Sequence, residues 1–170
     1  MQRYPLKLTL ANGQTSLVDA DVFDEVSKFS WCVMGGYAAR KVGDGSNDLV
    51  WLHKKIMGAS PGQEVDHKDG DYLNNQRHNL RKATRQQQIH NTRKRSDGET
   101  SLFKGVHYDS RCSRRPWVTS IKTPVGKRIA VHHATEDEAA RTYDALAREH
   151  FGEFACVNFP GPGERSALHH

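Results

Sequence analysis

The sequence predicts an α+β protein built from small modules rather than from one large globule. Only 36% of its 170 residues are hydrophobic and 26% are charged, so the composition favours surface over core. Short runs of alternating apolar and polar residues predict strands, and two capping boxes predict helices. A chain of this length holds one ordinary domain or two small ones, and we expect thinly cored modules.

Residues 1–60 are typical of short strands joined by turns, so we expect a β-rich leader there. The next section begins with the run EVDH and continues through a polar loop to LRKATRQQQIHNTRK. In that run Thr84 is followed three residues later by Gln87, a capping box that predicts the start of a helix. The polar, basic stretch TRKRSDGET then indicates a linker over 96–101.

The last section predicts a small antiparallel sheet and one helix. Alternation over 103–109, 116–122 and 127–133 predicts three strands. Thr135 and Glu138 form a second capping box, which opens the helix. One face of that helix carries Ala139, Tyr143, Leu146 and Ala147.

Positive charge is concentrated in the middle of the chain. The formal net charge is +5, but residues 68–128 hold 15 Lys or Arg against 5 Asp or Glu. This stretch therefore carries +10 and the remainder −5. A central positive stretch indicates a polyanionic partner, and a merely solvated face is the alternative.

The sequence gives no sign of export or of membrane insertion. No stretch reaches the roughly 18 apolar residues of a membrane span. The N-terminal MQRYPLKLTLANG lacks the apolar core of a signal peptide. Cys32, Cys112 and Cys156 are odd in number, lie far apart and form no CxxC pair. We therefore expect a cytoplasmic protein in a reducing compartment, with no membrane partner and no disulfide framework.

The strongest chemical signal is the adjacent pair Asp66 and His67. Hydrolysis of a phosphodiester needs a base that titrates near neutrality, which histidine supplies, and a hard cation at the phosphate. Neighbouring side chains on a strand point to opposite faces, so both cannot aim at one metal. We assign Asp66 to the metal and His67 to the base, while an ordinary polar loop remains the alternative.

The run LVWLHKKIMG…EVDHKDGDYLNNQRHNLRKATRQQQIHN resembles the HNH endonuclease domain of phage and intron-encoded homing endonucleases, over about 49–95. The resemblance implies a ββα-metal active site and divalent-metal-dependent cleavage of DNA inside a bacterial or phage-infected cell. Carried over, Asp66 is the metal-binding acid and His67 the general base. Asn79 is the central asparagine that holds the loop and orients the base.

The family's second metal ligand, usually Asn or His on the helix, aligns with Gln88, which keeps the carbonyl oxygen on a longer arm. His90 lies about 200° further around the helix and points away from that face. Asn91 shares the face of Gln88 and is the reserve ligand. The implied ion is Mg²⁺, with Mn²⁺ as the alternative. His53 is a packing residue or a phosphate contact.

The run from SLFKGVHY to CVNFP resembles the APETALA/ethylene-response-factor DNA-binding domain, over about 101–160. This resemblance implies that a β-sheet enters the major groove of double-stranded DNA. If alternate residues of the second strand face the helix, the inward side chains are Trp117, Thr119 and Ile121, with Ile129 and Val131 on the third strand. The outward ones are Val118, Ser120 and Lys122, with Arg128 and Ala130.

The candidate DNA contacts share a polar or basic side chain on the linker, the turns or the outward face. They are Arg93, Lys94, Arg95, Lys104, His107, Arg111, Arg114, Arg115, Ser120, Lys122, Lys127 and Arg128. We assign Lys122 and Arg128 to guanine edges and most of the others to phosphates. Asp109 opposes phosphate binding and is better explained as ordinary surface.

The sequence therefore predicts a site-specific, metal-dependent DNA endonuclease of the homing type that nicks one strand or cuts both. Its predicted parts are a leader and nuclease domain over 1–95, a linker over 96–101, a DNA-reading domain over 102–160 and a tail over 161–170. The competing hypothesis is a non-catalytic DNA-binding regulator on a nuclease-derived fold. A nuclease of RNA or of the restriction type is weaker. No heptad or apolar stripe identifies a homodimer interface.

Overall fold

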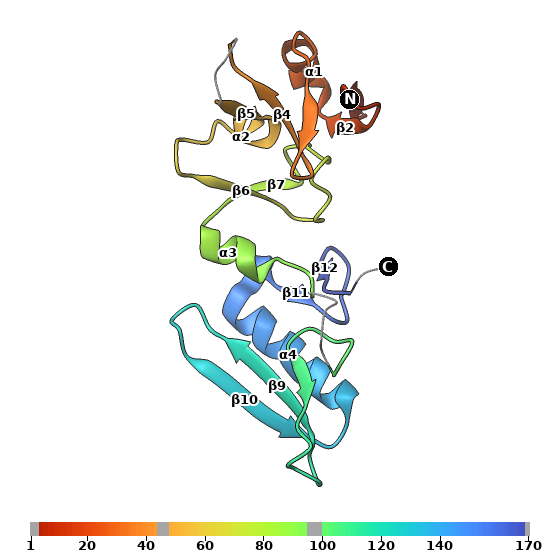
Figure 1. Ribbon diagram of the computed structural model, residues 1–170, viewed down its shortest axis with the longest axis vertical. Helices are drawn as coiled ribbons and strands as arrows, with labels where there is room; N and C mark the ends of the chain where they lie inside the picture. Colours follow the sequence, from red (N-terminus) through yellow and green to blue (C-terminus); the bar gives the residue numbers. More distant parts are fainter. Residues whose placement is uncertain (1–3, 44–47, 95–99, 169–170) are drawn as a thin grey trace. The chain divides into compact units, whose positions relative to one another are not determined.

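The computed structural model describes residues 4–43, 48–94 and 100–168. The chain divides into two compact units, Met1–Arg85 and Gln86–His170 (Figure 1). Each unit mixes small sheets with few helices, so the predicted α+β class is confirmed. The boundary between the units falls at the start of helix α3 (Arg85–His90), earlier than the boundary placed at residue 95 from the sequence.

The described part of the first unit contains three small antiparallel sheets and two short helices. The sheets are β1 (Leu6–Thr9) with β2 (Thr15–Val18); β3 (Cys32–Met34), β4 (Tyr37–Lys41) and β5 (Leu49–Trp51); and β6 (Glu64–His67) with β7 (Leu80–Ala83). The helices are α1 (Ala20–Val26) and α2 (Leu52–Ile56).

The two helices correct the expectation that the leader consists of strands and turns. In α1, Val22 and Val26 are four residues apart, lie on one face and are buried in the first unit's core. Trp31 is fully buried beside them, and its indole N–H donates to the Val26 carbonyl at 2.8 Å. Tertiary burial of these few apolar residues stabilises a helix too short to be stable alone.

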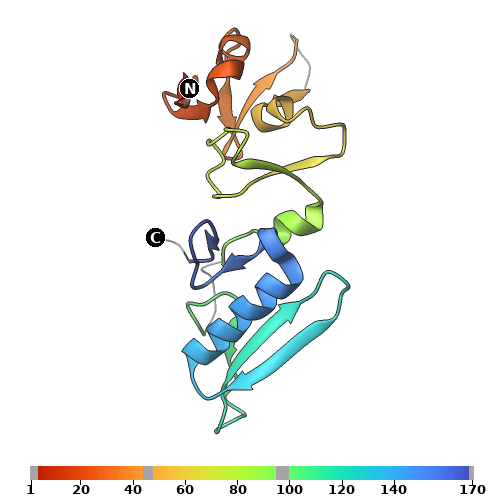
Figure 2. The same cartoon turned by 180° about the vertical axis from the view of Figure 1, so that it is seen from behind.

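The second unit is a three-stranded antiparallel sheet with helix α4 (Glu136–Phe151) along one face (Figure 2). Its strands are β8 (Val106–Tyr108), β9 (Trp117–Lys122) and β10 (Arg128–His133), with β9 in the centre. A 3₁₀ turn, Gly152–Phe154, leads into a short parallel pair, β11 (Cys156–Val157) with β12 (Arg165–Ser166). The three predicted strands and the predicted helix are confirmed.

The start of α4 matches the predicted capping box. The Glu138 amide donates to the Thr135 hydroxyl at 3.2 Å, and the Glu138 carboxylate accepts from the Thr135 amide at 3.4 Å. The predicted apolar face is buried against the sheet, where the Thr119 hydroxyl donates to the Ala139 carbonyl at 2.6 Å. Val131 lies opposite Thr119, on the side of the helix, yet remains 38% exposed at the edge strand.

Two features of the second unit were not predicted. Gly105 has φ +71°, and a Cβ placed there would lie 2.1 Å from Tyr143 Cδ2, so the KGV turn requires glycine. The buried Asp144 carboxylate accepts from the backbone amides of Asn158 and Phe159, both at 2.7 Å. These bonds fasten the closing segment to α4, although burial raises the pKa of Asp144.

Candidate active site

The hairpin of β6 and β7 places Asp66 and His67 side by side in the chain. In the antiparallel register Asp66 lies opposite Arg81, and His67 lies opposite Leu80. The Asp66 side chain contacts the guanidinium of Arg81, whereas the ring of His67 lies among the aromatic rings of the first unit. The two side chains thus have separate surroundings, as alternation along a strand requires.

Asp66 takes part in a buried ion pair. The Arg81 Nη2 and Nε groups donate to Asp66 Oδ2 at 2.7 and 2.9 Å, and the Arg81 and Asp66 side chains are only 9% and 8% exposed. Sequence reasoning did not identify Arg81, although a known hairpin register would have placed it opposite Asp66. The guanidinium offsets the carboxylate charge through charge-assisted hydrogen bonds.

His67 is 1% exposed and is surrounded by rings from across the first unit. Its ring centroid lies 5.9 Å from that of Tyr37, 5.3 Å from that of His53 and 5.8 Å from that of Tyr72. Burial lowers the pKa of His67, against smaller opposing effects from Asn75 and nearby carboxylates. The ring is therefore neutral near pH 7, the state in which it can accept a proton.

His53 belongs to the same buried cluster. It is 5% exposed, and burial lowers its pKa to about 3, with a further contribution from His67. Its position supports the packing interpretation rather than a phosphate contact. Tyr37 links the two histidines and also stacks on Tyr72, at a centroid separation of 4.4 Å.

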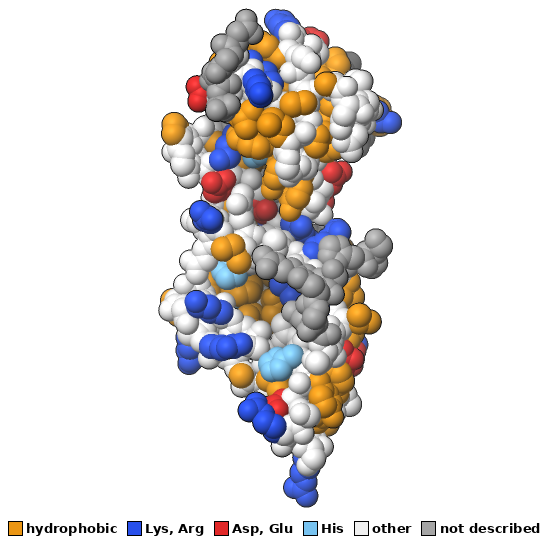
Figure 3. Space-filling model, in the orientation of Figure 1, with side chains coloured by type: hydrophobic (Ala, Val, Ile, Leu, Met, Phe, Trp, Pro, Cys, Tyr) orange, Lys and Arg blue, Asp and Glu red, His pale blue; other side chains and the backbone are white. Residues whose placement is uncertain are grey.

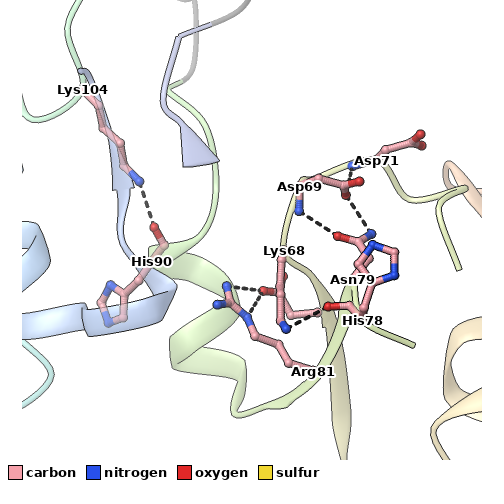
Figure 4. A network of polar contacts seen from close by, with 9 residues as sticks. Lys68, Asp69, Asp71, His78, Asn79, Arg81, His90 and Lys104 are labelled. Atoms are coloured by element: carbon pink, nitrogen blue, oxygen red, sulfur yellow. Dashed lines mark hydrogen bonds and ion pairs between the residues drawn. The ribbon is translucent and has the colours of Figure 1, made fainter. Parts of the chain in front are cut away.

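The loop between β6 and β7 is held together by Asn79. Its side-chain amide donates to Asp69 Oδ1 at 2.9 Å, and its Oδ1 accepts from the Asp69 amide (Figure 4). The same side-chain amide also donates to the Asn74 carbonyl at 2.8 Å. The contact with the His67 ring comes instead from Asn75, whose Oδ1 lies 3.3 Å from Nε2. Sequence reasoning identified Asn79 but missed Asn75, which stands in the same run, NNQRHN.

The acidic residues of this loop bind within the loop itself. Asp69 Oδ1 accepts from the Asp71 amide, and Asp71 Oδ1 accepts from the Leu73 amide, each at 2.9 Å. Lys68 Nζ donates to the His78 carbonyl at 2.8 Å. No group of three or more His, Cys, Asp or Glu suited to a metal occurs among the described residues.

Helix α3 carries the other predicted metal ligands and begins at the residue after Thr84, the predicted cap. Gln88 is half-buried, and Asn91, just beyond the helix, is 1% exposed. His90 and Phe151 both belong to the second unit, and their rings stack at a centroid separation of 3.8 Å. Burial lowers the pKa of His90. This packing agrees with the exclusion of His90 as a ligand.

The predicted outward face of the second unit's sheet is exposed at Lys122, Arg128 and Ala130. Val118, which was also expected to face outward, is only 4% exposed, because it lies on the central strand between His107 and His132 of the flanking strands. The Arg128 Nε donates to the Ser120 hydroxyl at 3.0 Å, and Arg128 lies directly opposite Lys122. His107, on β8, lies opposite Val118 and therefore shares this face. Exposed basic side chains on the adjoining turns are Arg114, Arg115 and Lys127. Figure 3 shows Lys and Arg side chains spread over the visible face of the second unit.

Other members of the predicted contact set are engaged within the protein. The Lys104 amine donates to the carbonyls of His90 and Thr92 at 2.9 and 2.6 Å, and burial lowers its pKa. Arg111 is 88% exposed but forms a bidentate pair with Asp109, which lowers the pKa of that carboxyl to about 2. Lys104 is thus a structural cation, and the charge of Arg111 is largely offset.

The expected linker is also partly folded into the second unit. Arg93 and Lys94 are half-buried, and the Lys94 amine donates to the Ser101 carbonyl. Ser101 is buried and donates to Glu136 at 2.6 Å. Arg95 and residues 96–99 of the expected linker lie outside the described residues.

Comparison with known proteins supplies the family. A family model for HNH endonucleases matches residues 49–89. An uncharacterized HNH endonuclease of Acanthamoeba polyphaga mimivirus is 34% identical over 159 residues, which cover 86% of this chain and 75% of the relative. The chain belongs to the HNH endonuclease family. No solved structure matches it.

Membership in the HNH endonuclease family gives the site its chemistry. The matched segment contains Asp66, His67, Asn79 and Gln88. An HNH endonuclease is a nuclease that hydrolyses DNA, and such enzymes generally use a divalent metal. None of the helices in the described part of the chain has the length and apolar character needed to cross a membrane.

Proposed function

We propose that this HNH endonuclease is a site-specific, divalent-metal-dependent DNA endonuclease of the homing type, with His67 as its general base. The observation that carries the proposal is the buried, neutral ring of His67 beside Asp66, inside the segment that matches the family. A neutral imidazole accepts a proton from water, and the resulting nucleophile attacks the phosphorus in line.

The donors at the proposed metal ligands suit Mg²⁺, with Mn²⁺ as the alternative. The Asp66 carboxylate and the Gln88 amide carbonyl both offer hard oxygen atoms, and Asn91 is the reserve donor. Mg²⁺ commonly takes only one or two protein ligands and keeps waters and phosphate oxygens for the rest, which fits a site with a single carboxylate. When bound, the ion stabilises charge on the phosphate and on the leaving oxygen.

The other residues of the first unit position these groups. Arg81 holds the Asp66 carboxylate by two hydrogen bonds and offsets its charge within the buried hairpin. Asn79 fixes the loop that follows His67 through its bonds with Asp69 and Asn74. Such positioning lowers the reorganisation needed during proton transfer.

The second unit is proposed to select the DNA site, as an APETALA/ethylene-response-factor-like reader. The proposal rests on the outward, exposed positions of Lys122 and Arg128 and on the Ser120 hydroxyl that holds the Arg128 guanidinium. A bidentate Arg is the commonest reader of guanine in the major groove. Contacts with phosphates are assigned to His107, Arg114, Arg115 and Lys127.

Selection from a plasmid library with randomised inserts tests this function. The full-length protein with Mg²⁺ is expected to cut a defined sequence, with nicked circles or linear molecules reporting one or two broken strands. EDTA is expected to abolish the cuts. Selective binding without any cleavage would favour the competing non-catalytic regulator.

A further inference from the structure

Three buried side chains of the first unit form a hydrogen-bonded chain that ends at His67. The Ser16 hydroxyl donates to the Leu73 carbonyl at 2.8 Å, and the Asn75 side-chain amide donates to the Ser16 oxygen at 2.8 Å. Asn75 Oδ1 lies 3.3 Å from His67 Nε2. Ser16 and Asn75 are both 0% exposed, although they are separated by 59 positions in the sequence.

The direction of each bond follows from the chemistry of the groups. The Leu73 carbonyl can only accept, so the single hydroxyl proton of Ser16 is directed to it. The Ser16 oxygen must then accept from Asn75, which turns the NH₂ of that amide toward Ser16. The Asn75 oxygen therefore faces His67 and also can only accept. His67 Nε2 consequently carries the ring proton.

The backbone holds this chain in place. The Leu17 amide donates to the Leu73 carbonyl at 2.9 Å, and the Asn75 amide donates to the Leu17 carbonyl at 2.8 Å. These two bonds dock the loop against β2, where Leu17 and Asn74 form an isolated parallel bridge. The N-terminal hairpin is thus joined to the loop that contacts the proposed base.

We propose that Ser16 and Asn75 are positioning residues that fix the tautomer of His67 with its proton on Nε2, so that Nδ1 is the nitrogen that accepts the proton of water. The leader is then part of the active site rather than an independent support. This inference rests on the proposed role of His67. The assignment of one ring nitrogen by a hydrogen bond at the other is a general property of catalytic histidines.

Nitrogen-15 NMR of the histidine rings in the full-length, DNA-free protein tests the tautomer directly. The wild type is expected to carry the His67 proton on Nε2. Ser16→Ala removes the acceptor that orients the Asn75 amide and is expected to shift the ring proton of His67 from Nε2 to Nδ1. Ser16→Thr keeps the hydroxyl and is expected to keep the wild-type tautomer. Asn75→Leu is a second variant that removes the contact with His67 altogether. The matched control is Ser27→Ala, an exposed serine in the same unit.

Kinetics on a duplex selected from the library separates positioning from general stability. Because general-base catalysis contributes about 10²–10⁴-fold, we expect Ser16→Ala to lower kcat about 10-fold without changing KM, and to have no further effect in a His67→Ala background. If Ser16→Ala and Asn75→Leu both fold and keep the wild-type tautomer of His67, the positioning role of Ser16 and Asn75 is overturned, while the proposed function is unaffected. Full cleavage by His67→Ala would overturn the proposed function, whatever the tautomer.

Discussion

Acidification should destabilise the first unit through His53. Its ring is buried in the aromatic cluster, and burial lowers its pKa from 6.5 to about 3. A histidine whose pKa is lower in the folded protein than in the unfolded chain makes its full contribution to the free energy of unfolding above pH 6.5. That stability is lost as the pH falls toward 3, because the unfolded chain binds the proton first.

The magnitude follows from the same shift. Between pH 6.5 and pH 5 the unfolded histidine gains its proton while the folded one stays neutral, which costs about 2 kcal/mol at about 1.36 kcal/mol per pH unit. His53→Leu has a similar volume and cannot titrate. We therefore expect the stability of the wild type, relative to His53→Leu, to fall by about 2 kcal/mol between pH 7.5 and pH 5.

Urea unfolding followed by tryptophan fluorescence measures this difference, because Trp31 is fully buried in the first unit. The comparison cancels the contribution of His67, whose pKa is also lowered by burial. Parallel stability curves for the two proteins from pH 7.5 to pH 5 would contradict this prediction, since they would show that His53 titrates alike in the folded and unfolded chains.

Three further predictions concern single contacts. Arg81→Met leaves the buried Asp66 carboxylate without its guanidinium and should lower the free energy of unfolding in urea by about 3–5 kcal/mol. Adding Asp66→Leu should recover most of this loss, and an unchanged urea midpoint in Arg81→Met would contradict the prediction. Gly105→Ala should destabilise the second unit far more than Gly126→Ala, because only Gly105 would place its Cβ against Tyr143; equal melting temperatures would argue against the clash. Lys122→Ala should weaken DNA binding and, in a salt titration, reduce the slope of log affinity against log salt concentration by about one. An unchanged slope would show that Lys122 does not contact the DNA phosphates.

The second unit could be predicted well because its signals are local. Strand alternation and the capping box at Thr135 are written within a few neighbouring residues, and both are confirmed. The first unit was predicted less well. Helix α1 depends on the burial of Val22 and Val26 against a core contributed by several strands, which no local pattern reveals.

The candidate site shows the same division. Asp66, His67 and Asn79 stand in a run that resembles a known family, so they could be predicted as site residues from the sequence alone. The partners that decide their surroundings come from elsewhere: Ser16 lies 59 positions from Asn75, and Tyr37 belongs to another sheet. Lys104 was expected to bind phosphate because only its charge is visible in the sequence, whereas its amine is held by two backbone carbonyls.

The role of His67 as general base is tested most directly by the single-turnover cleavage rate of His67→Ala on the selected duplex with Mg²⁺. The matched control is His78→Ala, which changes an exposed histidine on the same hairpin loop. We expect His67→Ala to bind the duplex with wild-type affinity and to cleave it about 10²–10⁴-fold more slowly, while His78→Ala cleaves normally. Wild-type cleavage by His67→Ala, or an equal loss of binding and cleavage, would contradict the role assigned to His67.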